Sequence, residues 1–230
     1  KIVQSIRKTA DACGVQIVTG DTKVVERGKG DKIFINTTGF GPVHPKAEIA
    51  DEKIKCGDKI IISGNIAQHG MAIMSQREGL EFESDIVSDT TNLNFLVWEL
   101  LEAFGEKIHL FRDPTRGGLA SVLLEMARDI KKGVTLNEQA LPVEKQVAAA
   151  CEMLGLDPLY VANEGLFVTI VDAAIADEVV ALMKNTDKGI NALCIGEITE
   201  EHPRKVVLHS GLGGKRIITP MIGEQLPRIC

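Results

Sequence analysis

Short aliphatic runs, many of them β-branched, alternate with longer segments of helical periodicity from Asp58 to His209. The clearest helix is Thr91–Phe104, in which leucine and valine recur every three or four positions and form one apolar stripe. Asp89, Thr90 and Thr91 are its N-cap candidates. Strands are predicted at 58–63, 166–171, 192–198, 206–209 and 216–219 and around Leu136, and helices at 66–77, 119–130, 143–154 and 173–184. Each helix or sheet must bury its apolar face against another element, so this alternation predicts an α+β layer.

The N-terminal part has a different pattern. Apolar residues next to Lys1 recur at helical spacing, and Gly14 ends the run. A domain rarely begins inside a helix, so we expect an N-terminal portion to be missing in front of Lys1. The predicted short strands are 16–18, 24–25 and 33–38, the last pairing with the preceding one across a Gly-rich turn in a hairpin-like arrangement.

Gly39–Pro45 is a linker and the expected domain boundary. We predict that residues 1–43 are the remainder of an N-terminal domain and that residues 44–219 form a C-terminal α+β domain. Residues 220–230 contain two prolines and one glycine without periodicity, which predicts a flexible tail.

Composition excludes several classes of protein. The 230 residues carry a net charge of −6 and contain one Trp and one Tyr, which argues against nucleic acid as a partner. No apolar stretch approaches the roughly 20 residues of a membrane span, and the start does not resemble a signal peptide. The five cysteines form no CxxC pair and are odd in number, so neither a disulfide framework nor a zinc site is expected. A soluble protein of the reducing cytoplasm is predicted.

A loop with two successive glycines, Asp113–Gly118, leads into a predicted helix. Backbone N–H groups and the helix dipole attract anions at such a position, and Gly117 and Gly118 allow close approach of a phosphate. Arg116 can add a charge-assisted contact. The alternative is an ordinary helix start with Asp113 as its cap, and the spacing alone leaves both open.

A second polar turn, Gly20–Lys23, follows a predicted strand. Asp21 can hold Mg²⁺ and Thr22 can contact phosphate or metal, because hard cations prefer oxygen ligands. Lys23 can neutralise charge that develops on a transferring phosphate. The alternative is an exposed polar hairpin turn.

Two further positions are candidates for chemistry. His69–Gly70 lies at the start of a predicted helix, where a lone histidine is commonly a surface or capping residue. Glu164 lies between Asn163 and Gly165 at the mouth of an apolar strand, where a carboxylate can act as a base. The alternative for Glu164 is a solvated acid in a turn.

The last residue of the chain is Cys230, so a thiol ends the predicted tail. From Gly223 the arm can reach roughly 23 Å at ~3.3 Å per residue, enough to enter a partner's active site and to fold back into its own. The alternative is an incidental unpaired cysteine.

Four stretches together resemble the HypE family of hydrogenase maturation factors. They are GDTKVV (20–25), SGNIAQHG (63–70), DPTRGGLA (113–120) and PRIC (227–230). The first three fit the ATP-using superfamily that includes aminoimidazole ribonucleotide synthetase and selenophosphate synthetase. The terminal PRIC is the feature specific to HypE. The resemblance implies a two-domain α+β architecture of the aminoimidazole ribonucleotide synthetase type, with the first domain, for ATP binding and dimerisation, only partly present.

The resemblance also implies a reaction. A carbamoyltransferase, HypF, would place a carbamoyl group on Cys230, and ATP-dependent dehydration would turn the thiocarbamate into a thiocyanate. The cyano group would pass to iron held by a HypC–HypD complex, supplying cyanide ligands of [NiFe]-hydrogenase. The implied cofactors are ATP and Mg²⁺, and a homodimer is implied as well.

The implied roles follow the chemistry of the residues. Asp21 and Thr22 would hold Mg-ATP, and Lys23 would stabilise the transferring group. The Asp113–Gly118 loop, with His69 and Gly70, would bind the nucleotide. Glu164 would be the base and Cys230 the covalent carrier. Two alternatives stay open: another ATP-dependent kinase or synthetase of the superfamily, and a non-catalytic carbamoyl carrier.

Overall fold

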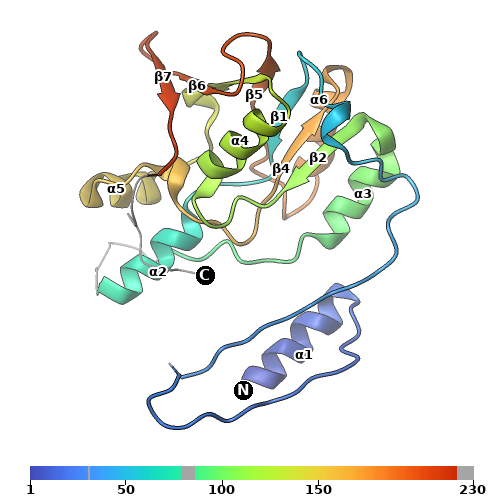
Figure 1. Ribbon diagram of the computed structural model, residues 1–230, viewed down its shortest axis with the longest axis vertical. Coiled ribbons are helices and arrows are strands. Elements are labelled where there is room, and N and C mark those ends of the chain that lie inside the picture. The colour runs from blue at the N-terminus through green and yellow to red at the C-terminus, as the bar shows by residue number, and fades with distance from the viewer. Residues whose placement is uncertain (31, 79–85, 222–230) are drawn as a thin grey trace. The chain divides into compact units, whose positions relative to one another are not determined.

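The computed structural model describes residues 1–30, 32–78 and 86–221, and the chain divides into two compact units, Lys1–Pro45 and Lys46–Cys230 (Figure 1). The predicted tail therefore lies, from residue 222 on, outside the described residues. Within the part that is described, no helix is long and apolar enough to cross a membrane.

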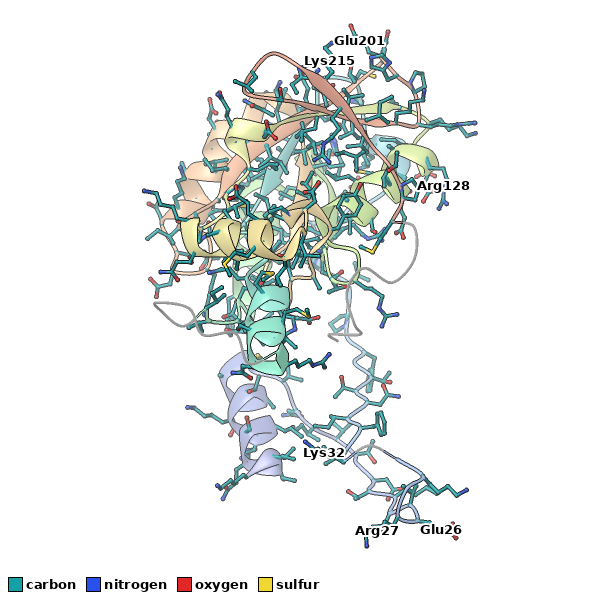
Figure 2. All side chains as sticks on the ribbon, turned by 90° about the vertical axis from the view of Figure 1, so that its left-hand side faces the viewer. Glu26, Arg27, Lys32, Arg128, Glu201 and Lys215 are labelled. Atoms are coloured by element: carbon teal, nitrogen blue, oxygen red, sulfur yellow. The ribbon has the colours of Figure 1, made fainter. Side chains whose placement is uncertain are left out.

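The first unit contains one helix, α1 (Ile2–Cys13), within its described residues. It ends as predicted at Gly14, whose φ of 67° is the left-handed conformation that glycine adopts easily. The predicted strands at 16–18, 24–25 and 33–38 are wrong, because the described residues between 15 and 44 form neither helix nor strand. Figure 2 shows Glu26 and Arg27 at the tip of this loop.

Exposed apolar side chains explain why the strands are absent. Val18, Val24 and Phe34 are all exposed. A hairpin by itself is marginal in water and needs a third strand or a helix against its apolar face. The β-propensity that predicted these strands therefore lacks the packing that would stabilise them within this unit.

The second unit is built on a mixed sheet, so the predicted α+β class is confirmed. In the described residues the strand order is β2-β4-β1-β5-β3-β6-β7. The strands are β1 (Lys59–Ile62), β2 (Ile108–Arg112), β3 (Gly133–Asn137), β4 (Val168–Val171), β5 (Leu193–Thr199), β6 (Val206–His209) and β7 (Lys215–Ile218). Neighbouring strands are antiparallel except for the parallel pair β3–β6. Strand β2 was not predicted from the sequence.

Helices cover both faces of this sheet (Figure 1). The α-helices are α2 (Gln68–Glu78), α3 (Asn94–Phe104), α4 (Gly118–Asp129), α5 (Lys145–Leu154) and α6 (Ala176–Lys184). Alternate residues of β1 point to opposite faces, so Ile60 and Ile62 pack with α4 and Ile61 packs with α3 and α6. A third cluster joins α2 and α5.

Short 3₁₀ turns connect several of these elements. They are η1 (Asp51–Lys53), η2 (Gly105–Lys107), η3 (Glu138–Ala140), η4 (Pro158–Tyr160) and η5 (Ala173–Ile175). The turn η4 lies between α5 and β4 and packs against α4. It leads directly into the Asn163–Gly165 segment that the sequence singles out.

Candidate functional site

Asn163 connects three loops of the second unit. Its carboxamide oxygen accepts a hydrogen bond from the N–H of Ala67 at 2.7 Å, at the start of α2. Its Nδ2 donates to the carbonyls of Pro114 at 2.8 Å and Val161 at 3.1 Å. Asn163 is only 1% exposed, so these bonds form in a region where unpaired polar groups are costly. The amide thereby fixes the loop before α4, the start of α2 and its own turn to one another.

The next two residues are held by Asp89. Its carboxylate accepts hydrogen bonds from the N–H of Glu164 at 3.1 Å and of Gly165 at 2.9 Å. A Cβ on Gly165 would lie 1.6 Å from the Asp89 carbonyl oxygen, so the two segments approach as closely as only glycine permits. The turn that carries Glu164 is therefore fixed from both sides, and the Glu164 side chain is half-buried.

Asp89 was predicted as a helix cap, and that prediction is wrong. Helix α3 begins at Asn94 with Leu93 at its N-cap and no side-chain cap, and the predicted start at Thr91 is three residues early. The Asp89 carboxylate is engaged instead with a turn 75 residues later in the chain. A sequence window around α3 cannot contain this partner, which is why local pattern assigned Asp89 a local role.

The Asp113–Gly118 loop reaches α4 through two left-handed glycines. Gly117 has a φ of 76° and Gly118 a φ of 62°, and a Cβ on Gly118 would lie 2.5 Å from the Leu159 carbonyl oxygen. Gly117 is the N-cap residue, and no described side chain accepts a hydrogen bond there, so Asp113 is not the cap. The N–H of Gly118 donates to the Thr115 carbonyl at 3.0 Å, and the N–H groups that follow it in the first turn have no side-chain acceptor among the described residues. The exposed side chain of Arg116 lies one residue before Gly117. This donor set fits a phosphate.

His69 and Gly70 lie in the first turn of α2, close to the same segments. The N–H of Gly70 donates to the Ala162 carbonyl at 3.0 Å, and a Cβ on Gly70 would lie 2.3 Å from the Val161 side chain. His69 is 9% exposed, so the expectation of a surface histidine is wrong. Its Nδ1 lies 2.9 Å from Ser88 Oγ, and its buried Nε2 has no hydrogen-bond partner among the described residues.

A cavity of about 210 Å³ adjoins this turn. It lies beside Gly165 and is lined by Ser63, Gly64 and Asn65 after β1, together with Asp89 and Lys188. The Lys188 ammonium donates to Thr91 Oγ1 at 2.5 Å, on the rim of the same cavity. Polar side chains and glycine backbone thus surround a space next to the Glu164 turn.

The remaining candidates lie in the first unit or in the tail. Asp21, Thr22 and Lys23 are all exposed, and Asp21 Oδ1 accepts from the Thr22 N–H at 2.7 Å. Asp21 and Thr22 line a hollow with α1. Among the described residues no three His, Cys, Asp or Glu side chains gather so as to hold a metal ion. Cys230 lies outside the described residues.

The structure therefore brings together Glu164, His69, Gly70 and the Asp113–Gly118 loop within the second unit. Sequence reasoning missed Asn163 and Asp89, which hold this arrangement in place. The available signal was a polar residue, Asn163, directly between apolar Val161–Ala162 and the apolar strand that follows Gly165. A buried amide in such a position is normally fully hydrogen-bonded.

Comparison with known proteins now decides the family. The sequence model described as "AIR synthase related protein, C-terminal domain" matches residues 55–209, and the corresponding N-terminal domain matches residues 1–43. The chain is 48% identical over 230 residues to carbamoyl dehydratase HypE of Azotobacter vinelandii, covering 100% of this chain and 67% of that protein. The chain belongs to the HypE family.

Other members agree along the whole chain. Carbamoyl dehydratase HypE of Bradyrhizobium diazoefficiens is 48% identical over 229 residues, which cover 100% of this chain and 66% of that protein. A crystal structure of HypE in complex with ATP has a TM-score of 0.94 at 42% identity, covering 100% of this chain and 69% of that one. A crystal structure of a HypE–HypF complex has a TM-score of 0.91 at 43% identity, covering 95% of this chain and 70% of that one. The chain spans about two thirds of the length of these curated relatives.

Proposed function

We propose that this chain carries out ATP-dependent dehydration of a carbamoyl group bound to the thiol of Cys230. The observation that supports this most strongly is the 48% identity over its whole length to carbamoyl dehydratase HypE. The similarity to a HypE crystallised with ATP supports ATP as the co-substrate.

The proposed reaction balances in two steps. The carbamoyl oxygen of the thiocarbamate attacks the γ-phosphorus of ATP, and the bond to the bridging oxygen breaks, so ADP leaves with the electron pair. Both N–H protons are then lost, the C–O bond breaks and inorganic phosphate leaves, giving S–C≡N. Phosphorylation is needed because an amide oxygen is a poor leaving group, and such transfer depends chiefly on positioning and charge neutralisation.

Residues of the second unit supply the base and part of the phosphate site. Glu164 is proposed to accept an N–H proton, since Asn163 and Asp89 fix the turn that carries it. The N-terminus of α4, which begins after Gly117, would bind phosphate oxygens through the N–H groups that follow Gly118, and Gly117 and Gly118 would let the phosphate approach the backbone, with Arg116 and Asp113 in the same loop. His69 and Gly70 would complete the nucleotide side of the site.

Residues of the first unit supply the remaining groups. Asp21 would hold the Mg²⁺ that accompanies ATP, which would neutralise phosphate charge, and one exposed carboxylate suits an ion that keeps phosphate and water ligands. Thr22 would contact the phosphates or the metal. Lys23 would stabilise charge on the transferring phosphoryl group.

Two protein partners are proposed for the chain. A HypF-type carbamoyltransferase would load Cys230, and a crystal structure of a HypE–HypF complex supports this partner. A HypC–HypD complex carrying iron would accept the cyano group. We further propose a cytoplasmic homodimer, in accordance with the resemblance.

The test is intact mass after incubation with the transferase, carbamoyl phosphate and ATP, with Cys230→Ala as the control. The experiment is run on the chain alone and on the chain joined to the N-terminal third of the Azotobacter vinelandii relative. Gain of a carbamoyl group followed by loss of one water, both absent in Cys230→Ala, is the expected result.

Other outcomes support the alternatives. If both forms gain a carbamoyl group and neither form loses water, the chain has a carrier role. Loss of water only in the joined form would mean that the N-terminal third completes the ATP site. ATP turnover that survives Cys230→Ala would instead favour another kinase or synthetase of this superfamily.

A further inference from the structure

Residues 157–160, which form η4 and its N-cap after α5, contact β7 and Thr219, where the chain leaves the sheet towards Cys230. The Tyr160 hydroxyl donates a hydrogen bond to the Thr219 carbonyl oxygen at 2.7 Å. Asp157, the residue before η4, provides a second link, because its Oδ2 accepts a hydrogen bond from Arg216 Nη1 of β7 at 2.7 Å. Figure 1 shows the chain running from β7 to the segment that follows α5. Two contacts thus fasten β7 and the residue after it to η4.

Strand β7 needs such a fastening because it lies at the edge of the sheet. Among the described strands it pairs with β6 alone, and the last residue pair of that ladder is Ile218 with Val206. Thr219 is exposed and lies just beyond the ladder, where the end of an edge strand would normally fray. Tyr160 is suited to prevent this, since its ring packs against the main apolar cluster while its hydroxyl reaches the surface.

The segment that holds the tail also carries the candidate base. The carbonyls of Leu159 and Val161 lie against Gly118, so Tyr160 is fixed beside the start of α4. Four residues after Tyr160 comes Glu164, in the turn held by Asn163. The start of the tail and the candidate base are therefore attached to one short, well-anchored segment.

We propose that Tyr160 is a positioning residue that fixes the origin of the Cys230 arm beside the site. The proposal rests on the proposed function. Eleven residue steps separate Thr219 from Cys230, and at ~3.5 Å each they reach at most about 38 Å. A group tethered within this reach has a high effective concentration at the site, and holding Thr219 in place shortens the tether and raises that concentration further.

The direct test of the fastening is hydrogen exchange measured by mass spectrometry on the chain and on Tyr160→Phe. Removing one hydroxyl loses a single hydrogen bond, which corresponds to about two- to tenfold faster exchange in the peptide that covers residues 216–221. Exchange in α4 should not change. Thr219→Ala is the matched control, because it keeps the carbonyl acceptor and should exchange like the parent chain. Equal exchange in Tyr160→Phe and the parent would overturn the proposal.

The positioning role is tested by comparing an attached with a detached arm. The measurement uses the form that dehydrates the carbamoyl group, either the chain alone or the joined chain. In that form, single-turnover water loss from carbamoylated Cys230 should slow at least about twofold in Tyr160→Phe. Carbamoyl loading by the transferase should be unchanged. The detached substrate is a synthetic peptide of residues 222–230 with an S-carbamoyl terminal cysteine, supplied to Cys230→Ala with and without Tyr160→Phe. Its kcat/KM should be the same in both.

The outcomes separate this proposal from the proposed function. Equal slowing with the attached arm and the detached peptide would mean that Tyr160→Phe damages the site itself, which contradicts a positioning role. An unchanged rate with the attached arm would also overturn that role while leaving the dehydratase function intact. Absence of water loss in the parent chain in both forms would reject the function and, with it, the positioning role.

Discussion

The N–H of Ala67 donates to the side-chain oxygen of Asn163 at 2.7 Å, across 96 positions of sequence. Ala67 has a φ of 72°, a left-handed conformation that L-residues seldom adopt. Such strain persists where the surroundings hold it, and the buried carboxamide of Asn163 is the group that does so here. The start of α2 and the Glu164 turn are therefore parts of one hydrogen-bonded unit.

Replacing Asn163 by Asp should destabilise the second unit by about 2–4 kcal/mol. The two Nδ2 donations to Pro114 and Val161 are lost, and a carboxylate in their place faces two carbonyl oxygens. Urea unfolding followed by circular dichroism measures the change. Asn185→Asp is the control, because Asn185 is exposed at the end of α6 and should cost little. Equal midpoints for the two variants would contradict the role assigned to Asn163.

Replacing Gly165 by Ala should be among the most disruptive single changes in the chain. The added Cβ would lie 1.6 Å from the Asp89 carbonyl oxygen and 3.0 Å from the Thr91 nitrogen, so backbone must move. We expect a loss of about 3 kcal/mol or more, measured by the same unfolding experiment. Gly64 lines the same cavity, so Gly64→Ala is the matched control. Its added Cβ would lie 4.0 Å from the Leu166 side chain, an ordinary van der Waals contact. Similar losses in both variants would show that cavity lining, not close approach, sets the cost.

Much of the second unit could be predicted because its signals are local. Helix α5 ends at Leu154, where the predicted range 143–154 ends, and the Gly155 that follows has a left-handed φ of 66°, which glycine adopts easily. Strand β6 has the predicted bounds 206–209. In both cases the residues that set the boundary lie inside the element or next to it.

What sequence reasoning missed depends on distant partners. The predicted strand at 33–38 had the right propensity and no surface to pack against within its unit. Strand β2 is five residues long, has β4 as its one partner in the described part of the sheet, and is interrupted by an irregularity between Ile108 and Leu110. Asn163 and Asp89 act across 96 and 75 positions of sequence, respectively, so no local window reveals them.

Burial, together with the smaller effect of the nearby Asp157 carboxylate, raises the pKa of the Cys151 thiol from 9.0 to about 11. As pH rises through 9, the unfolded chain loses this proton before the folded chain does. The stabilisation is therefore complete below pH 9 and is lost progressively towards pH 11. The free energy of unfolding should fall more steeply over this window in the parent chain than in Cys151→Ala. Parallel slopes would contradict this.

Exposed Cys56 gives a second readout of the same difference. At about pH 8, iodoacetamide should label Cys56 in the folded chain and leave Cys151 unlabelled, because the thiolate is the reactive form. In urea both should react. Labelling of Cys151 at the rate of Cys56 in the folded chain would show that the thiol is accessible and its pKa ordinary.

The last prediction concerns the base. Glu164→Gln keeps the size of the side chain. It also keeps the backbone N–H that donates a hydrogen bond to the Asp89 carboxylate, so the turn should keep its geometry. The variant should still gain a carbamoyl group on Cys230, because loading does not use Glu164. Water loss should slow by about 100-fold or more, in line with the usual contribution of a general base. Intact mass over time separates the two steps.

Two comparisons make this test specific to the carboxylate. Glu200→Gln removes an exposed acid on the loop after β5 and should dehydrate at the parent rate. Glu164→Asp keeps the carboxylate but shortens its reach by one methylene, so it should retain more activity than Glu164→Gln. Full water loss in Glu164→Gln would assign the proton to another group, and buried His69, whose Nε2 lacks a partner among the described residues, would be the next residue to replace.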